Sequence, residues 1–132
     1  MNPLAEPTAE PTTSQTRRNT VGISTHILDT GRGRPAAGIP VTLEERRGET
    51  WVPIGSAESD ADGRVRSLVP AGREITPGTH RLRFDLYDYS TAQDRPCFFP
   101  MVEVTFRIED PAEHYHVPLL LSGFGYSTYR GT

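Results

Sequence analysis

Three histidines on predicted strands are the side chains best placed to do chemistry. His26 lies in the alternating segment 22–28, and His114 and His116 lie opposite the apolar residues of segment 114–122. Because successive side chains of a strand point to opposite faces, all three imidazoles are expected to face away from the core. Because an imidazole changes its charge near neutral pH and can bind metals, these are the residues to consider first. Each one alone is more simply an exposed strand histidine, lying in water or in an interface between subunits.

Other chemistries are less well supported by the same residues. His114 and His116 at positions i and i+2 could bind zinc with His26, but no carboxylate or thiolate partner is evident. No G-x-S-x-G element and no phosphate-binding glycine loop is present. The only cysteine, Cys97, is more simply interpreted as a small packed residue than as a nucleophile. All fourteen basic residues are arginines, which excludes a Schiff-base lysine.

The elements that must position these histidines are strands joined by turns. Twelve glycines and twelve prolines in 132 residues argue against long helices. Asp60-Ala61-Asp62-Gly63 is a turn signal directly before Arg64, which is most simply a solvated cation. Strands are predicted over 22–28, 39–44, 50–57 (with Trp51 as an anchor), 79–87, 101–109 and 114–122, a loop over 29–38, and a short helix over 89–94. The pattern favours an all-β antiparallel sandwich.

Bulk properties limit the remaining possibilities. The formal net charge of −3 offers no basic excess for phosphates, so a nucleic-acid partner is not expected. No stretch is long and apolar enough to cross a membrane, and the N-terminus is a poor secretory signal. Residues 1–20 carry repeated Glu-Pro-Thr elements and are interpreted as a flexible tail, before one domain over 21–132. We expect a cytoplasmic protein without a membrane partner.

Several separated motifs carry a resemblance to a known family. They are STHILDT at 24–30 with GRPA at 33–36, DGR at 62–64, TPG at 76–78, HYHVPLLLS at 114–122 and GYSTYRGT at 125–132. In this order they resemble the signatures of the 5-hydroxyisourate hydrolases, a transthyretin-like family. The resemblance covers essentially everything from Val21 onward.

The resemblance implies a fold, an assembly and a reaction. The implied fold is a transthyretin-like antiparallel β-sandwich of about eight strands with at most one short helix. The implied assembly is a homotetramer with active sites in a channel between dimers, which agrees with histidines that face away from each subunit's core. The implied reaction is hydrolysis of the cyclic amide of 5-hydroxyisourate to 2-oxo-4-hydroxy-4-carboxy-5-ureidoimidazoline in urate degradation, without a cofactor or metal.

Matched residue by residue, the resemblance also implies a site. The catalytic residues would be His26, Arg64 and His116, and the substrate-binding residues would be Tyr129, Arg130, Gly131 and Thr132. An arginine beside an imidazole discourages its protonation and can stabilise negative charge on an attacked carbonyl. Which histidine takes the first proton is left open. The last residue departs from the family's usual serine, because Thr132 keeps the hydroxyl and adds a methyl group that restricts χ1.

A non-catalytic carrier is the main alternative. Transthyretin itself uses the same fold to carry hormone, so the fold does not by itself imply hydrolysis. The carrier lacks the Tyr-Arg-Gly-Ser type of ending and the histidine–arginine combination. This chain has both apart from the final threonine, which favours the enzyme over a carrier of small ligands.

Overall fold

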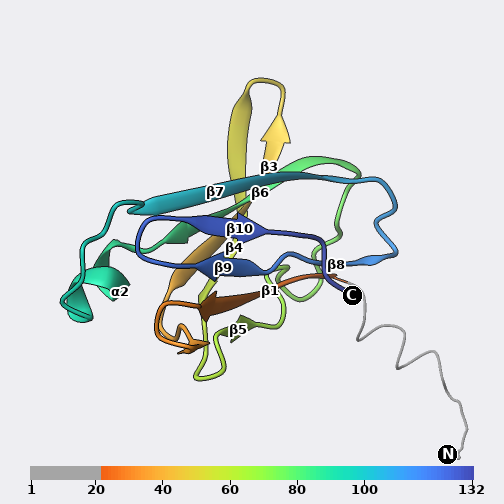
Figure 1. Ribbon diagram of the computed structural model, residues 1–132. Helices are drawn as coiled ribbons and strands as arrows, with labels where there is room; N and C mark the ends of the chain where they lie inside the picture. The colour runs from red at the N-terminus through yellow and green to blue at the C-terminus, as the bar shows by residue number, and fades with distance from the viewer. Residues whose placement is uncertain (1–21) are drawn as a thin grey trace, which may run out of the picture.

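A computed structural model describes residues 22–132, so the predicted tail over 1–20 and the start of the domain at Val21 lie outside the described residues. Two sheets form a sandwich, with one helix, α2 (Tyr87–Ala92), at one end (Figure 1). One sheet has the order β4-β3-β6-β7, and it contains β3 (Pro40–Arg47), β4 (Thr50–Glu58), β6 (Gly78–Asp85) and β7 (Met101–Ile108). The predicted all-β sandwich is confirmed, and residues 22–132 contain one short helix.

The second sheet is organised around β1. It contains β1 (Gly22–Asp29), β2 (Arg34–Pro35), β5 (Arg64–Val65), β8 (His114–His116), β9 (Leu119–Leu121) and β10 (Tyr126–Thr128). β1 pairs antiparallel with β2 and β5 and parallel with β8 and β9. The expectation of purely antiparallel pairing therefore holds for the first sheet but not around β1. These parallel pairings place the C-terminal strands beside the first described strand.

The core lies between the sheets and follows the predicted alternation. Along β1, Ile23 and Ile27 are fully buried while His26 is only half-buried. The corresponding core side chains of the other sheet are Val41, Leu43, Leu82, Phe84, Val102 and Ile108. Because a strand alternates its faces, burying this stripe turns Ser24 and His26 toward the outer face of the sheet.

The local structure differs from the sequence-based expectations at several places. The long strand predicted over 114–122 is divided into β8 and β9, because Pro118 between them has no N–H for a strand ladder. The helix predicted over 89–94 begins and ends two residues earlier, and the loop predicted over 29–38 includes the two-residue β2. Trp51 lies on the first sheet with the Arg81 guanidinium 4.2 Å from its ring centroid, rather than in the core.

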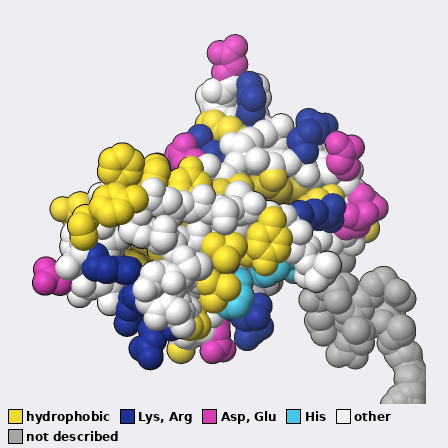
Figure 2. Space-filling model, viewed as in Figure 1, with side chains coloured by type: hydrophobic (Ala, Val, Ile, Leu, Met, Phe, Trp, Pro, Cys, Tyr) yellow, Lys and Arg dark blue, Asp and Glu magenta, His cyan; other side chains and the backbone are white. Residues whose placement is uncertain are grey.

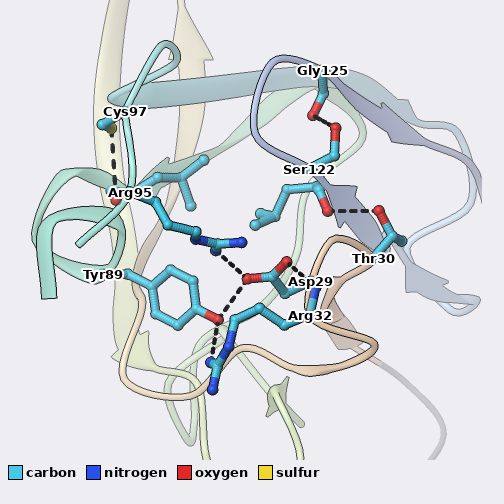
Figure 3. A network of polar contacts seen from close by, with 10 residues as sticks. Asp29, Thr30, Arg32, Tyr89, Arg95, Cys97, Ser122 and Gly125 are labelled. Atoms are coloured by element: carbon cyan, nitrogen blue, oxygen red, sulfur yellow. Dashed lines mark hydrogen bonds and ion pairs between the residues drawn. The ribbon is translucent and has the colours of Figure 1, made fainter. Parts of the chain in front are cut away.

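The C-terminal end of β1 is tied to α2 by a buried carboxylate (Figure 3). Asp29 is fully buried, and its Oδ2 accepts hydrogen bonds from Arg95 Nη2 and, at 2.8 Å, from Tyr89 Oη. Its Oδ1 accepts the backbone N–H of Arg32 at 3.1 Å. Burial alone would raise the pKa of Asp29, but the bonds from Arg95 and Tyr89 outweigh it and hold that pKa below its ordinary value. This network fixes one end of β1.

Candidate functional site

Strand pairing brings the predicted site residues Arg64 and His116 beside β1. Ser24 lies opposite His116 in the parallel pairing with β8, and His26 lies opposite Arg64 in the antiparallel pairing with β5. These side chains come from three strands that are distant in sequence but adjacent in space. Figure 2 shows histidine side chains reaching the surface beside arginine and hydrophobic side chains, where β1, β5 and β8 lie in Figure 1.

The turn before β5 allows Arg64 to approach β1 closely. Gly63 adopts a positive φ of 77°, and a Cβ atom there would lie 2.4 Å from the carbonyl oxygen of Ile27. The backbone N–H of Ile27 donates to the Gly63 carbonyl at 2.7 Å. The carboxylate of Asp60 accepts the backbone N–H of Arg64 at 2.9 Å, which closes the turn. Only glycine fits this contact, so the Asp-Gly-Arg motif is what presents Arg64 beside His26.

The protonation pattern of His26 follows from its partner. Its Nε2 lies 2.9 Å from the carbonyl oxygen of Asp62. A carbonyl oxygen only accepts hydrogen bonds, so Nε2 must carry the proton and donate it. In the neutral form of His26 the bare nitrogen is therefore Nδ1.

His116 and His114 share one hydroxyl group. Ser24 Oγ lies 2.8 Å from Nδ1 of His116 and 2.7 Å from Nε2 of His114. Ser24 is nearly buried at 6% exposure, whereas both histidines are half-buried. Nδ1 of His116 is thus occupied by Ser24, and Nε2 is the nitrogen left for reaction with a substrate.

The environment of His116 favours its neutral form. Burial lowers the pKa of His116 below its ordinary value of 6.5, and electrostatic repulsion from His114, Arg64 and His26 disfavours its protonation further. Burial penalises the charged imidazolium, and nearby cations repel it. His116 is therefore uncharged at neutral pH and able to accept a proton.

A cavity of about 300 Å³ collects most of these groups. The residues lining it are Ser24, Thr25, Arg64, Val65, Arg66, His114, His116 and Thr132. Of the predicted site residues, Arg64, His116 and Thr132 line this cavity, and His26 flanks it through its pairing with Arg64. Two larger cavities of about 650 and 690 Å³ lie elsewhere, and no histidine or cysteine is among the described residues that line them.

The C-terminal residues predicted to bind substrate divide into two pairs. Gly131 donates its backbone N–H to the His116 carbonyl at 2.8 Å, and a Cβ at this position would lie 2.6 Å from Cδ2 of His116. The glycine therefore lets the chain end run directly against the imidazole, placing Thr132 at the cavity. Tyr129 is 57% exposed, and Arg130 forms an ion pair with Glu113 at 2.9 Å. Within one chain, neither of these two residues lines the cavity.

Ser24 and His114 are the contacts that the sequence-based site omitted. His114 was predicted to face outward with His26 and His116 but was assigned no role in the hydrolase site, and Ser24 was not singled out. The signal that could have found them is the outward face they share with His26 and His116. Among residues 22–132 no group of three or more histidine, cysteine or acidic side chains is arranged to hold a metal ion, and no helix is long and apolar enough to cross a membrane.

The comparisons with known proteins agree with this architecture. Residues 23–131 match the family described as HIUase/Transthyretin. A 5-hydroxyisourate hydrolase from Salmonella dublin is 43% identical over 110 residues, covering 83% of this chain and 80% of the relative. Sea bream transthyretin in complex with thyroxine has a TM-score of 0.77 at 28% identity, covering 83% of this chain and 94% of that chain. The structure of Klebsiella pneumoniae 5-hydroxyisourate hydrolase has a TM-score of 0.71 at 29% identity, covering 83% and 98%.

Proposed function

The chain belongs to the HIUase/Transthyretin family, and from this premise we propose that it hydrolyses 5-hydroxyisourate, a step of urate degradation. The observation that carries the proposal is the cavity in which His116, held neutral by its surroundings, lies with Arg64. A neutral imidazole supplies a base, and a guanidinium supplies a positive charge for a developing oxyanion. Both groups accelerate the opening of a cyclic amide by water.

The proposed reaction begins at Nε2 of His116. This nitrogen takes a proton from water as the water oxygen attacks the carbonyl carbon of the cyclic amide. Arg64 stabilises the negative charge on the carbonyl oxygen. The C–N bond then breaks, the leaving nitrogen takes a proton from the imidazolium, and the product is 2-oxo-4-hydroxy-4-carboxy-5-ureidoimidazoline. His26, with its Nε2 donating to Asp62, offers Nδ1 to position the water.

We further propose that the active protein is a homotetramer, without a cofactor and without nucleic-acid or membrane partners. The site lies on the outer face of the sheet, where a second subunit could cover it. Large hydrophobic side chains are exposed on the same sheet and the adjoining turns, at Phe124, Tyr126 and Tyr129. Light scattering should give a mass near four times the 14.6 kDa of one chain. A mass near one chain would contradict this assembly.

A non-catalytic carrier is the second candidate. The TM-score of 0.77 to the thyroxine complex of sea bream transthyretin exceeds the 0.71 to the Klebsiella pneumoniae hydrolase. The two values come from the same fold and do not separate binding from hydrolysis. A carrier would bind thyroxine and leave 5-hydroxyisourate to decay at its spontaneous rate.

The deciding experiment follows the decay of 5-hydroxyisourate by absorbance. Urate oxidase generates the compound in place, and its decay is measured without protein, with wild type and with His116→Ala. Wild type should accelerate the decay, and the variant should be slower by about 10²–10⁴-fold, the usual contribution of a general base. An unchanged thermal unfolding midpoint in the variant separates lost chemistry from lost folding.

Two further arms complete the test. Preincubation with a chelator should leave the wild-type rate unchanged, whereas a metal-dependent hydrolase would lose it. Thyroxine is titrated against the same protein by calorimetry. Decay at the spontaneous rate together with thyroxine binding would replace the hydrolase with the carrier.

A further inference from the structure

The hydroxyl group of Ser24 lies between two imidazoles, and the proposed reaction has not yet used it. Its oxygen is 2.8 Å from Nδ1 of His116 and 2.7 Å from Nε2 of His114. Both distances are those of short hydrogen bonds. Ser24 is almost completely buried, so bulk water does not compete freely for these contacts.

A proton count restricts how the three groups can be arranged. A serine hydroxyl has one proton, so it can donate to only one of the two nitrogens and must accept from the other. If Ser24 donates to His116, then Nδ1 of neutral His116 is bare and Nε2 carries the proton. If Ser24 donates to His114, then Nδ1 of His116 carries the proton and Nε2 is bare.

Of these two arrangements, the second is the one in which His116 is ready to act as a base. Nε2 of His116 can take a proton from water only when it is bare. Once it has done so, both ring nitrogens carry protons, and Nδ1 still donates to Ser24. The hydrogen bond therefore persists through proton transfer and becomes charge-assisted when the imidazolium forms. The first arrangement would require the ring proton to move from Nε2 to Nδ1, and the Ser24 proton to turn away from Nδ1, before catalysis.

We propose that Ser24 is a positioning residue that sets the tautomer of His116. Its oxygen accepts the Nδ1 proton of His116, and its own proton is donated to Nε2 of His114. His114 acts as the acceptor that directs the hydroxyl proton away from His116. This inference rests on the proposed function for its catalytic meaning, but the placement of the protons can be measured without turnover.

Strand pairing holds the three side chains in this order. The parallel register places Gly22 opposite His114 and Ser24 opposite His116. The backbone N–H of Val117 donates to the Ser24 carbonyl at 2.9 Å, which fixes Ser24 beside β8. On its other side the His116 ring packs against Gly131, where no Cβ fits. The imidazole is thus confined between Ser24 and the chain end.

The kinetic test uses a pair of variants with matched shape. Ser24→Thr keeps a hydroxyl group, and Ser24→Val has nearly the same volume without it, so both place a similar load on the buried site. We expect Ser24→Val to have a kcat about ten- to a hundredfold below that of Ser24→Thr, the effect of losing a hydrogen bond to a charged group. Equal kcat values in two folded variants would overturn the inference.

The second readout is the protonation of the ring nitrogens. Long-range proton–nitrogen correlation spectra of wild type, at a pH above the pKa of His116, should show Nδ1 protonated and Nε2 bare. In Ser24→Val the signal should move toward the opposite tautomer. A bare Nδ1 in wild type would overturn the inference even if every Ser24 variant failed to fold.

The two readouts keep this inference separate from the proposed function. If wild type does not hydrolyse 5-hydroxyisourate but Nδ1 of His116 is protonated, the hydrolase proposal fails and the tautomer assignment stands. If wild type is active but Nδ1 is bare, the assignment fails and the hydrolase stands.

Discussion

The two ends of β1 each hold an arginine beside an ionisable side chain, and they differ in whether the charges are paired. At the C-terminal end, Arg95 is 28% exposed and forms an ion pair with the fully buried Asp29. At the other end, Arg64 approaches His116 and forms no ion pair with any residue in the described range 22–132. Arg95 therefore neutralises the charge of Asp29, whereas the positive charge of Arg64 remains available to interact with a substrate.

This difference separates a structural cluster from a site that can do chemistry. Around Asp29 the hydrogen-bond acceptors are taken by Arg95, Tyr89 and Arg32, and a ligand would have to displace one of them (Figure 3). Of the two ring nitrogens of His116, Nδ1 is the one hydrogen-bonded within residues 22–132, to Ser24, and the residue lines a cavity. Groups with lowered pKa values occur in both kinds of cluster, so the open geometry is the more informative feature.

Of the two arginine substitutions, the larger effect on activity is expected from removing the charge of Arg64. Arg64→Gln should lower kcat/KM for 5-hydroxyisourate about 10²–10³-fold, the usual loss for one oxyanion-stabilising donor. The unfolding midpoint should change little, because no ion pair is broken. The coupled decay assay and thermal unfolding measure the two quantities. Arg107→Gln is the matched control, since Arg107 is exposed and its ion pair within residues 22–132 is with the likewise exposed Glu109, at 3.3 Å. A similar rate loss in this control would contradict a specific role for Arg64.

The opposite pattern is expected from Arg95→Gln. Leaving Asp29 buried without its cation should cost about 3 kcal/mol, the lower end of the usual 3–5 kcal/mol, because Arg95 is partly exposed and Tyr89 still donates to Asp29. Urea denaturation measures the loss, and the activity of the folded fraction should persist. Loss of activity without loss of stability would show that the two ends of β1 are not functionally distinct.

The same pair predicts how stability depends on pH. The pKa of Asp29 is held below its ordinary value of 3.8, so the folded state binds fewer protons than the unfolded state in the acid range. The stabilisation is therefore complete above pH 3.8 and is lost as the pH falls through the lower folded pKa. Arg95→Gln should flatten this acid dependence relative to wild type.

A smaller effect is expected in the pH profile of activity. His116 must be neutral to accept a proton, and its pKa is lowered, so the acid limb of kcat/KM should fall below pH 6.5. Arg64→Gln removes one of the three neighbours that disfavour the protonation of His116, the others being His114 and His26. The pH at which kcat/KM falls on the acid side should then rise by less than about one unit. An unchanged limb would place the titrating base somewhere other than His116.

The sequence predicted most of the local structure because burial imposes the strand period. The apolar stripe of β1 and the alternation of β7 were sufficient to orient the side chains of residues 23–28 and of β7. The parallel pairing of β1 with β8 could not be predicted, since it joins residues about ninety positions apart. Only such pairing determines which outward-facing residues become neighbours.

The site shows the same limit. The family motifs predicted His26, Arg64 and His116, and the spacing of His114 and His116 predicted a shared face. That Ser24 lies between the two imidazoles depends on a register that neither segment encodes alone. The position of Arg130 likewise follows from its pairing with Glu113 and from Tyr115, whose ring centroid lies 4.4 Å from the guanidinium.

The smallest effect is expected at Thr132, which lines the cavity together with Ser24 and His116. Thr132→Ser removes one methyl group at the edge of the cavity and keeps the hydroxyl group, so every hydrogen bond available to the side chain is preserved. The rate should change by less than about tenfold, or 1.4 kcal/mol in barrier height. A larger gain would show that the methyl crowds the substrate, and it should then appear mainly in KM. Thr132→Val, which keeps the shape and loses the hydroxyl, distinguishes the two contributions: a loss in Thr132→Val with little change in Thr132→Ser would assign the role of this residue to its hydrogen bond.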